Sequence, residues 1–372
     1  MRLTKLYIHN YKSFYDTTIE LDKMNILVGE NNSGKSNLID VLEFIDIAKN
    51  KNFNQAILEK GGFEKILNYN YNEKTILIEF NLENSSFFFK VRFSVNEEVS
   101  VTSIIIYGKE KSDLLPLHIN ASRYNKKLNI IKDRVYTNID NLVKLNLEYE
   151  LISLQFELSN ILSSISKTYA FNTETIRNKS HKESTKELAK DGSNLGKNLF
   201  HIKNTYPDTF ELISNSMIGI VNEIDAVDVQ ETFGNYLLGF QEQSKQIGID
   251  MVSDGTINLL STITALNQEG DKSILLAFDE PERYLHLKAV NYLLESFRAS
   301  EKQILITTHS TEILKYANLD EIVFIYRDVD GDTQSIRANK IDGLKDMLKE
   351  LSYDRDLTLD ELIADGIIGD FK

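Results

Sequence analysis

The segment Gly29-Glu30-Asn31-Asn32-Ser33-Gly34-Lys35-Ser36 constrains this chain more than any other part of it, because it matches the pattern G-x-x-x-x-G-K-[ST]. Before it, Met24–Val28 has the continuous apolar character of a buried strand, and after it residues 37–48 have the apolar spacing of a helix. Glycines in such a loop let backbone N–H groups close around phosphate oxygens, and the amino terminus of the following helix favours negative charge. The sequence therefore predicts a strand, a phosphate-binding loop and a helix at the centre of an α/β fold.

The side chains of this loop predict a nucleoside triphosphate as the ligand, together with Mg²⁺. Lys35 has the length and charge to reach the β- and γ-phosphates, and Ser36 can ligate the metal ion. The nucleotide contacts expected from this region are Gly29, Asn31, Asn32, Ser33, Gly34, Lys35, Ser36 and Asn37. The loop alone does not distinguish ATP from GTP.

Composition excludes several other classes of protein. The 372 residues include no cysteine, which rules out disulfides, thiolate zinc sites and cysteine nucleophiles. No window approaches the roughly 20 apolar residues that span a bilayer, and the first residues have no apolar signal segment, so we expect a cytoplasmic protein without membrane contact. The formal net charge of -14 argues against a chain that coats nucleic acid.

Two short basic stretches leave a local nucleic-acid contact open. Their cationic residues are Arg123, Lys126, Lys127, Lys132 and Arg134 in the first, and Arg177, Lys179, Lys182, Lys186 and Lys190 in the second. A solvated helix surface is the simpler interpretation, because charge runs usually have that role. Both interpretations stay open on the sequence alone.

The texture of the chain divides it into three parts. Residues 1–119 contain strand patterns at 5–8, 75–82 and 87–101 and form an amino-terminal lobe with the phosphate-binding loop. Residues 120–222 have long helical patterns, including 147–166, and are expected to be a helical insertion. In residues 223–372, strands at 274–278, 303–307 and 321–326 alternate with a helix at 285–299, which fits a parallel sheet.

Acidic residues follow one of these strands. The apolar run that begins at Ser273 ends at Asp279-Glu280-Pro281-Glu282, in the form of a Walker B segment. Asp279 would hold the metal ion, and Glu280 would polarise the attacking water as a general base. A helix-capping role is the alternative for such a pair, and the glycine loop elsewhere in the chain favours the catalytic one.

A histidine and a serine motif complete the set of candidates. His309 follows the strand 303–307, at the sheet edge where open α/β sheets bind ligands, so we expect a γ-phosphate contact there rather than a structural histidine. Ser253-Asp254-Gly255-Thr256 precedes a helix at 257–266, and its hydroxyl and free N–H groups suit either a second anion site or a simple helix cap. The catalytic candidates are therefore Lys35, Glu280 and His309.

In this order the motifs resemble those of the ABC-type ATPases of the SMC, RecF and OLD-like branch. The segments Asn10-Tyr11-Lys12-Ser13-Phe14, Gly61-Gly62-Phe63-Glu64, 191–195 and 362–369 are similar to those of OLD-like AAA-type ATP-binding proteins. The resemblance implies an α/β fold, an ABC-type ATPase head with a mixed β lobe, a parallel-sheet P-loop core and a helical insertion. One departure is Leu287, where the family usually has proline.

The same resemblance implies roles for further residues. Lys12 and Ser13 would contact the nucleotide, and Ser253, Asp254 and Gly255 would bind the γ-phosphate held by the opposite subunit. ATP and Mg²⁺ are then the cofactors, and hydrolysis needs a head-to-head homodimer around two nucleotides. A larger oligomer is compatible with this arrangement.

OLD proteins carry a metal-dependent Toprim nuclease after the ATPase, and Asp328-Val-Asp330-Gly-Asp332 could be compared with its D-x-D pair. Asp330-Gly331 is instead a hairpin turn signal between two strand-like segments, and too little chain follows for a Toprim domain. We therefore expect no nuclease activity. The acidic residues nearer the carboxyl end form a solvated face; they are Asp354, Asp356, Asp360, Glu361 and Asp365.

The function expected from these features is an ATPase switch. Its dimer would open and close with ATP and control a separately encoded effector, such as a nuclease or toxin, in the setting of anti-phage defence. The alternative is a RecF-like DNA-binding clamp in DNA repair, with the basic stretches against the DNA. A transporter ATPase fits less well, because the Ser253 motif and the helical insertion differ from those of transporters.

Overall fold

The structure is a computed structural model, and it describes residues 1–84, 87–96, 100–108, 117–122, 165–178 and 186–344. The chain forms two compact units. Unit 1 comprises Met1–Lys167, Lys272–Leu275 and Val323–Ile341, and unit 2 comprises Thr168–Asp271, Leu276–Ile322 and Asp342–Lys372.

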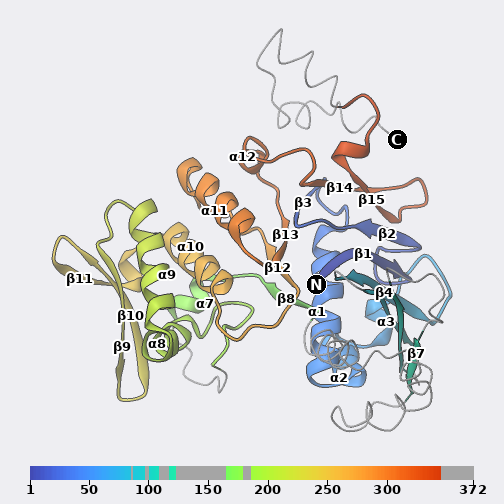
Figure 1. Cartoon of the computed structure of the whole chain (residues 1–372), viewed down its shortest axis with the longest axis horizontal. Coiled ribbons are helices and arrows are strands. Elements are labelled where there is room, and N and C mark those ends of the chain that lie inside the picture. The colour runs from blue at the N-terminus through green and yellow to red at the C-terminus, as the bar shows by residue number, and fades with distance from the viewer. Residues whose placement is uncertain (85–86, 97–99, 109–116, 123–164, 179–185, 345–372) are drawn as a thin grey trace. The chain divides into compact units, whose positions relative to one another are not determined.

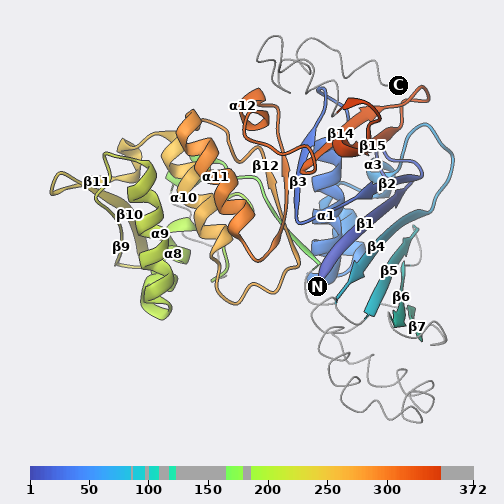
Figure 2. The ribbon, with the colours of Figure 1, turned by 45° about the horizontal axis from the view of Figure 1, so that its top comes forward.

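Unit 1 contains a six-stranded antiparallel sheet in the order β2-β1-β4-β5-β6-β7 (Figure 2). Its strands are β1 (Arg2–His9), β2 (Thr17–Glu20), β4 (Ile76–Glu83), β5 (Phe87–Val95), β6 (Ser100–Gly108) and β7 (Leu117–Ser122). In β1 the apolar residues Leu6 and Ile8 are fully buried, as the alternation along the strand requires. The sequence patterns predicted β1, β4 and β5, and the predicted run 87–101 also covers the start of β6; they did not predict β2 or β7.

The second part of unit 1 holds the glycine loop. The fully buried strand β3 (Met24–Val28) leads through the loop into α1 (Lys35–Asn50), and the short helices α2 (Phe53–Glu59) and α3 (Phe63–Ile66) follow. Strand β14 (Ile322–Arg327) lies between β3 and β15 (Thr333–Arg337) in sheet order, and a 3-10 turn, η2 (Ala338–Lys340), ends this part. Strands β14 and β15 form an antiparallel hairpin. Residues from the two ends of the sequence therefore surround the loop.

Unit 2 contains a three-stranded antiparallel sheet that the sequence patterns did not predict (Figure 1). Its strands are β9 (Ala226–Thr232), β10 (Asn235–Glu242) and β11 (Lys245–Gly248), in the order β11-β10-β9. Helices α8 (Leu195–Thr205) and α9 (Pro207–Ile220) pack on it. The alternation of buried Val227 and Val229 in β9, followed by Phe233-Gly234 at the turn, was the available signal for this hairpin.

The rest of unit 2 carries the acidic and histidine segments. The strands are β8 (Ser166–Tyr169), β12 (Leu275–Asp279) and β13 (Gln303–Thr307), with β12 between the other two. The helical elements are α7 (Thr173–Arg177), η1 (Ile249–Met251), α10 (Asp254–Leu266), α11 (Leu287–Ala299) and α12 (Thr311–Leu314). Phe278 of β12 contacts the rings of Tyr169 and Phe297, with centroid separations of 5.3 Å and 5.1 Å, and these buried rings are part of the core of the unit.

The mixed α/β class predicted from the sequence is confirmed. The first basic stretch, most of the helical pattern 147–166, the segment 362–369 and the five acidic residues at 354–365 lie outside the described residues. The three-part division at 119 and 222 stays a prediction. Among the helices that the structure describes, none is long and apolar enough to cross a membrane.

Candidate functional site

The glycine loop follows buried β3 in a conformation that only glycine permits at its two ends. A Cβ atom on Gly29 would lie 2.1 Å from the carbonyl O of Ile325, so any side chain there would collide with β14. Gly34 caps α1 with φ 117°, a left-handed conformation that disfavours L side chains. The two glycines of the motif therefore fix the path of the loop.

Lys35 and Ser36 occupy the first positions of α1. The Lys35 Nζ donates hydrogen bonds to the carbonyl oxygens of Gly29 and Glu30, at 2.6 Å and 2.9 Å, so the ammonium group lies across the loop. Ser36 is exposed at the start of the helix. Within the part of the chain that the structure describes, the buried Ser33 Oγ has no hydrogen-bond partner. A cationic group, an exposed hydroxyl and an orphaned polar atom in one loop suit a ligand with several acceptor oxygens.

The amino-terminal segment contacts the start of α1, and the nucleotide contacts expected of Lys12 and Ser13 stay a prediction. Asn37 Nδ2 donates to the Oγ of Ser13 at 2.7 Å, and Ser13 is 4% exposed. Lys12 has φ 48° and forms an ion pair with Asp40 of α1 at 2.5 Å. Burial raises the pKa of Asp40, but hydrogen bonds from Lys12 and Lys60 outweigh it, and the net pKa lies below the usual range. Lys12 is thus paired with the Asp40 carboxylate, and Ser13 contacts Asn37, which directly follows Ser36.

In unit 2, the predicted acidic pair and the histidine lie together. The Thr307 Oγ1 donates to Asp279 Oδ1 at 2.5 Å, and the Glu280 N–H donates to the carbonyl O of Thr307 at 3.2 Å. Glu280 has φ 47°, a left-handed conformation that residues with side chains rarely adopt. Residues held in this conformation cluster at functional sites. His309 Nε2 lies 3.7 Å from Glu280 Oε1, and both side chains are partly exposed. The sequence missed Thr307, which holds the Asp279 carboxylate and the backbone N–H of Glu280.

A third carboxylate, that of Glu282, follows this pair in the chain and is buried. Glu282 is 7% exposed and accepts a hydrogen bond from Thr308 Oγ1 at 2.5 Å, and Thr308 Oγ1 in turn accepts one from the Ser310 N–H at 2.9 Å. Burial, with the nearby Glu280 and Asp279 charges adding to it, raises the pKa of Glu282 to about 7. The hydrogen bond from Thr308 to Glu282 joins the acidic turn to the turn that carries His309.

The Ser253 motif caps α10, and Arg177, which lies outside the motif, donates hydrogen bonds to it. Ser253 Oγ accepts the Thr256 N–H at 3.1 Å, as the helix-cap interpretation predicted, while the Ser253 residue itself is exposed. A Cβ atom on Gly255 would lie 2.4 Å from the Tyr284 carbonyl O. Only a glycine therefore fits where this motif packs against the segment that follows Glu282.

Arg177 from α7 makes four hydrogen bonds to this region. Its guanidinium donates to Asp254 Oδ1 at 2.8 Å and 3.3 Å, to the Ile249 carbonyl O at 2.6 Å and to the Val252 carbonyl O at 2.7 Å. The hydrogen bond from Arg177 is the main cause of the lowered pKa of Asp254. Arg177 therefore clamps the segment before α10, a role different from the solvated surface or DNA contact considered for its basic stretch.

The aspartates at 328–332 form the hairpin turn that the sequence predicted. The Asp330 and Asp332 N–H groups donate to Asp328 Oδ1, at 3.1 Å and 2.8 Å, and Gly331 N–H donates to the Asp328 carbonyl O at 3.0 Å. Asp332 is buried, and its carboxylate accepts hydrogen bonds from Asn68 and Tyr71. The Asp328 and Asp332 carboxylates thus accept hydrogen bonds within the fold, and the expectation of no nuclease activity stays a prediction.

Comparison with known proteins places this geometry in context. A family model described as "AAA domain, putative AbiEii toxin, Type IV TA system" matches residues 24–315. A protein described as an ATP/GTP phosphatase, from Helicobacter pylori (strain ATCC 700392 / 26695), is 23% identical over 350 residues, covering 85% of this chain and 87% of that protein.

Among solved structures, a crystal structure of the Smc head bound to the C-winged helix domain of ScpA is similar, with a TM-score of 0.57 and 16% identity over 91% of this chain and 99% of that one. At this identity the likeness concerns the fold alone, and it confirms the expected α/β fold of such a head. The narrower resemblance to OLD-like proteins stays a prediction.

Proposed function

Because this chain belongs to the family of AAA domains whose model matches residues 24–315, we propose that it binds ATP and hydrolyses it to ADP and phosphate. The name of the Helicobacter pylori relative, an ATP/GTP phosphatase, supports the same reaction. The likeness to an Smc head supports a fold that suits it.

The glycine loop supplies the binding half of the proposal. Its backbone N–H groups and Lys35 would hold the β- and γ-phosphates, in place of the carbonyl oxygens that Lys35 now contacts. Other expected contacts are Asn31, Asn32, Ser33, Asn37, Lys12 and Ser13. Ser36 and Asp279 would hold Mg²⁺, which would neutralise the charge of the phosphate oxygens. The order of motifs along the chain, rather than a distance between the two units, supports assigning them to one nucleotide.

The observation that carries the hydrolysis proposal is the arrangement of Glu280. Thr307 holds its backbone in a left-handed conformation, and its partly exposed carboxylate faces His309 at 3.7 Å. Glu280 would accept the proton of a water that attacks the γ-phosphorus, while the bond to the β–γ bridging oxygen breaks and ADP leaves with the bonding electrons. His309 would donate a hydrogen bond to the γ-phosphate oxygens as their charge develops.

We also propose that hydrolysis takes place in a head-to-head homodimer. Ser253 is exposed at the amino terminus of α10, a 13-residue helix whose free N–H groups favour an anion. Ser253, Asp254 and Gly255 would therefore meet the γ-phosphate held by a second copy. ATP binding then adds affinity to the closed state, which is what a switch requires.

The partner of such a switch is proposed to be a separately encoded effector, such as a nuclease or toxin, in anti-phage defence. The family description names a toxin and a toxin–antitoxin system, which supports this setting. The RecF-like clamp has less support, because Arg177 donates its hydrogen bonds within the chain.

The test is a Glu280→Gln variant in the full chain. Removing a general base lowers such a rate on the order of 10²-fold or more, while ATP binding is retained. Phosphate release measures the rate, and light scattering measures whether the variant dimerises with ATP but not with ADP. Lys35→Ala is the matched control that loses ATP binding. A wild-type protein that releases no phosphate from ATP, or an unchanged rate in Glu280→Gln, would overturn the proposal.

A further inference from the structure

Thr333, the first residue of β15, contacts the glycine loop from the far end of the sequence. It is fully buried, and its Oγ1 lies 2.8 Å from the carbonyl O of Ser33 and 2.8 Å from Ser13 Oγ. A Cβ atom on Gly34 would lie 2.3 Å from the same hydroxyl. The Thr333 side chain therefore packs directly against the loop between Ser33 and Gly34.

The hydroxyl protons around Thr333 have one arrangement that satisfies every atom. A carbonyl can only accept, so the single Thr333 hydroxyl proton points to Ser33 O, and the Ser13 hydroxyl donates to Thr333 Oγ1. Asn37 Nδ2 donates to Ser13 Oγ at 2.7 Å. A directional chain thus runs from Asn37 through Ser13 and Thr333 to the backbone of Ser33, and such chains strengthen their members.

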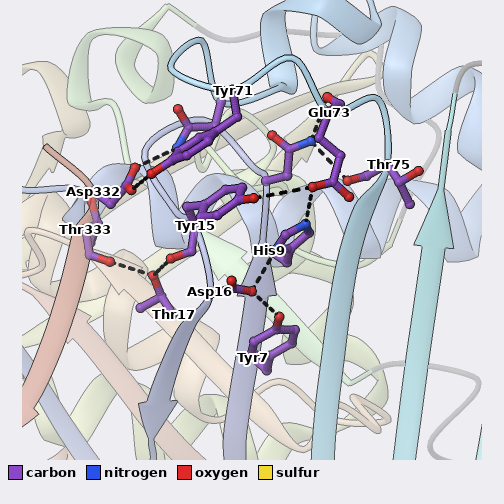
Figure 3. Close-up of polar contacts among 12 residues, drawn as sticks. Tyr7, His9, Tyr15, Asp16, Thr17, Tyr71, Glu73, Thr75, Asp332 and Thr333 are labelled. Carbon is purple, nitrogen blue, oxygen red and sulfur yellow. Dashed lines mark hydrogen bonds and ion pairs between the residues drawn. The ribbon is translucent and has the colours of Figure 1, made fainter. Parts of the chain in front are cut away.

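The backbone of Thr333 is held as firmly as its side chain. Its N–H donates to the Ser13 carbonyl O at 2.7 Å, and its carbonyl O accepts the Thr17 hydroxyl at 2.6 Å (Figure 3). The neighbouring Asp332 is 3% exposed and accepts hydrogen bonds from Asn68 and Tyr71, at 2.9 Å and 2.5 Å. The ring of Tyr71 stacks on that of Tyr15 with a centroid separation of 3.6 Å. The hairpin therefore presents the Thr333 hydroxyl to the loop in a fixed position.

We infer that Thr333 is a positioning residue of the nucleotide site: its hydroxyl holds the Ser33 carbonyl and Ser13 so that the loop is preformed for phosphate. The inference rests on the proposed function, since it concerns the loop assigned to ATP. A preformed loop binds more tightly because less ordering accompanies binding. The carboxyl-terminal hairpin is thereby part of the ATP site, although its residues match no nucleotide-binding motif.

The experiment compares ATP affinity, measured with a fluorescent ATP analogue, among variants of the full chain. Thr333→Val keeps the shape and removes the hydroxyl, and we expect its affinity to fall about tenfold, the effect of one lost hydrogen bond with a stranded buried carbonyl. Thr333→Ser restores the hydroxyl and is expected within about twofold of the wild type. Thr333→Cys, whose thiol donates weakly, serves if the valine variant does not fold.

Thr264→Val is the matched control, because Thr264 is also fully buried and donates its hydroxyl to a carbonyl, that of Leu260 at 2.7 Å. It should lose stability without losing ATP affinity. Wild-type affinity in the Thr333 variants that lack the hydroxyl, or an equal loss in Thr264→Val, would overturn the inference. If the wild type and Lys35→Ala bind the analogue alike, the proposed function itself fails, which separates the two outcomes.

Discussion

Replacement of Arg177 tests whether the segment before α10 must be clamped for the two subunits to meet. The guanidinium holds two backbone carbonyls and the Asp254 carboxylate, and its side chain is 22% exposed. Hydrogen bonds from a charged donor contribute about 1.5–3 kcal/mol each when buried, and water replaces part of that here. The Asp254 side chain is 44% exposed, so its ion pair with Arg177 adds only a few tenths of a kcal/mol, roughly. We therefore expect Arg177→Ala to lower the free energy of unfolding by about 2 kcal/mol.

The same free energy should appear in dimerisation if the clamp orders Ser253 and Asp254 for the opposite nucleotide. A loss of about 2 kcal/mol corresponds to roughly 30-fold weaker ATP-dependent association. The assay is light scattering across protein concentrations in the Glu280→Gln background with ATP, alongside ATP affinity of the monomer. Affinity of the monomer should not change, because the proposal assigns Ser253 and Asp254 to the nucleotide held by the opposite subunit.

Two further variants sharpen the result. Arg177→Lys keeps the charge, but its three N–H donors lie on one atom and cannot reproduce the four hydrogen bonds of the planar guanidinium, so it should recover only part of the loss. Lys186→Ala removes an exposed lysine of the same basic stretch and should leave dimerisation unchanged. Unaltered dimerisation of Arg177→Ala would refute the reasoning. Equal losses of DNA binding in Arg177→Ala and Lys186→Ala would instead favour the RecF-like DNA-binding function.

Two other predictions concern the acidic turn of unit 2. Burial raises the pKa of Glu282 from 4.5 to about 7, so the folded state binds a proton that the unfolded state releases, and stability should fall by on the order of 3 kcal/mol as pH rises through that window. Glu282→Gln lacks this term, and urea unfolding at pH 5 and pH 8 should show its stability gaining on that of the wild type at the higher pH; a constant difference would contradict the prediction. Gly255→Ala would place a methyl 2.4 Å from the Tyr284 carbonyl O, so it should cost about 2 kcal/mol or more in thermal unfolding and weaken dimerisation, whereas alanine at the open Gly219 should cost far less.

Local chemistry made much of the site predictable from the sequence. The pattern of the loop between Gly29 and Ser36 is complete within one segment, and the strand before Asp279 is an apolar run that ends in carboxylates. The hairpin at Asp328 was predictable because Asp-Gly turns have a characteristic backbone. In each case the motif consists of residues that are close in the chain, although the contacts that exclude side chains at Gly29 and Gly34 come from Ile325 and Thr333.

The residues that sequence reasoning missed act over long separations. Thr333 contacts Ser33 and Ser13 from about 300 positions away, and Arg177 reaches Asp254 across the β9–β11 sheet segment of the sequence. A threonine at a strand start or an arginine at a helix end has no distinctive pattern, because its role depends on which segment the fold brings beside it. Thr307 was nearer to discovery, since its hydroxyl directly precedes the turn with His309.

The most direct test of the central claim, ATP hydrolysis across a dimer interface, is subunit complementation. Lys35→Ala removes the loop contribution and Ser253→Arg blocks the contribution from the opposite subunit, so each variant alone should be inactive. In a mixture, half of the dimers are mixed and each contains one intact site, so the rate of phosphate release should recover to about a quarter of the wild-type rate. A mixture that stays inactive while wild-type protein hydrolyses ATP, or a Ser253→Arg variant that is active alone, would contradict the account.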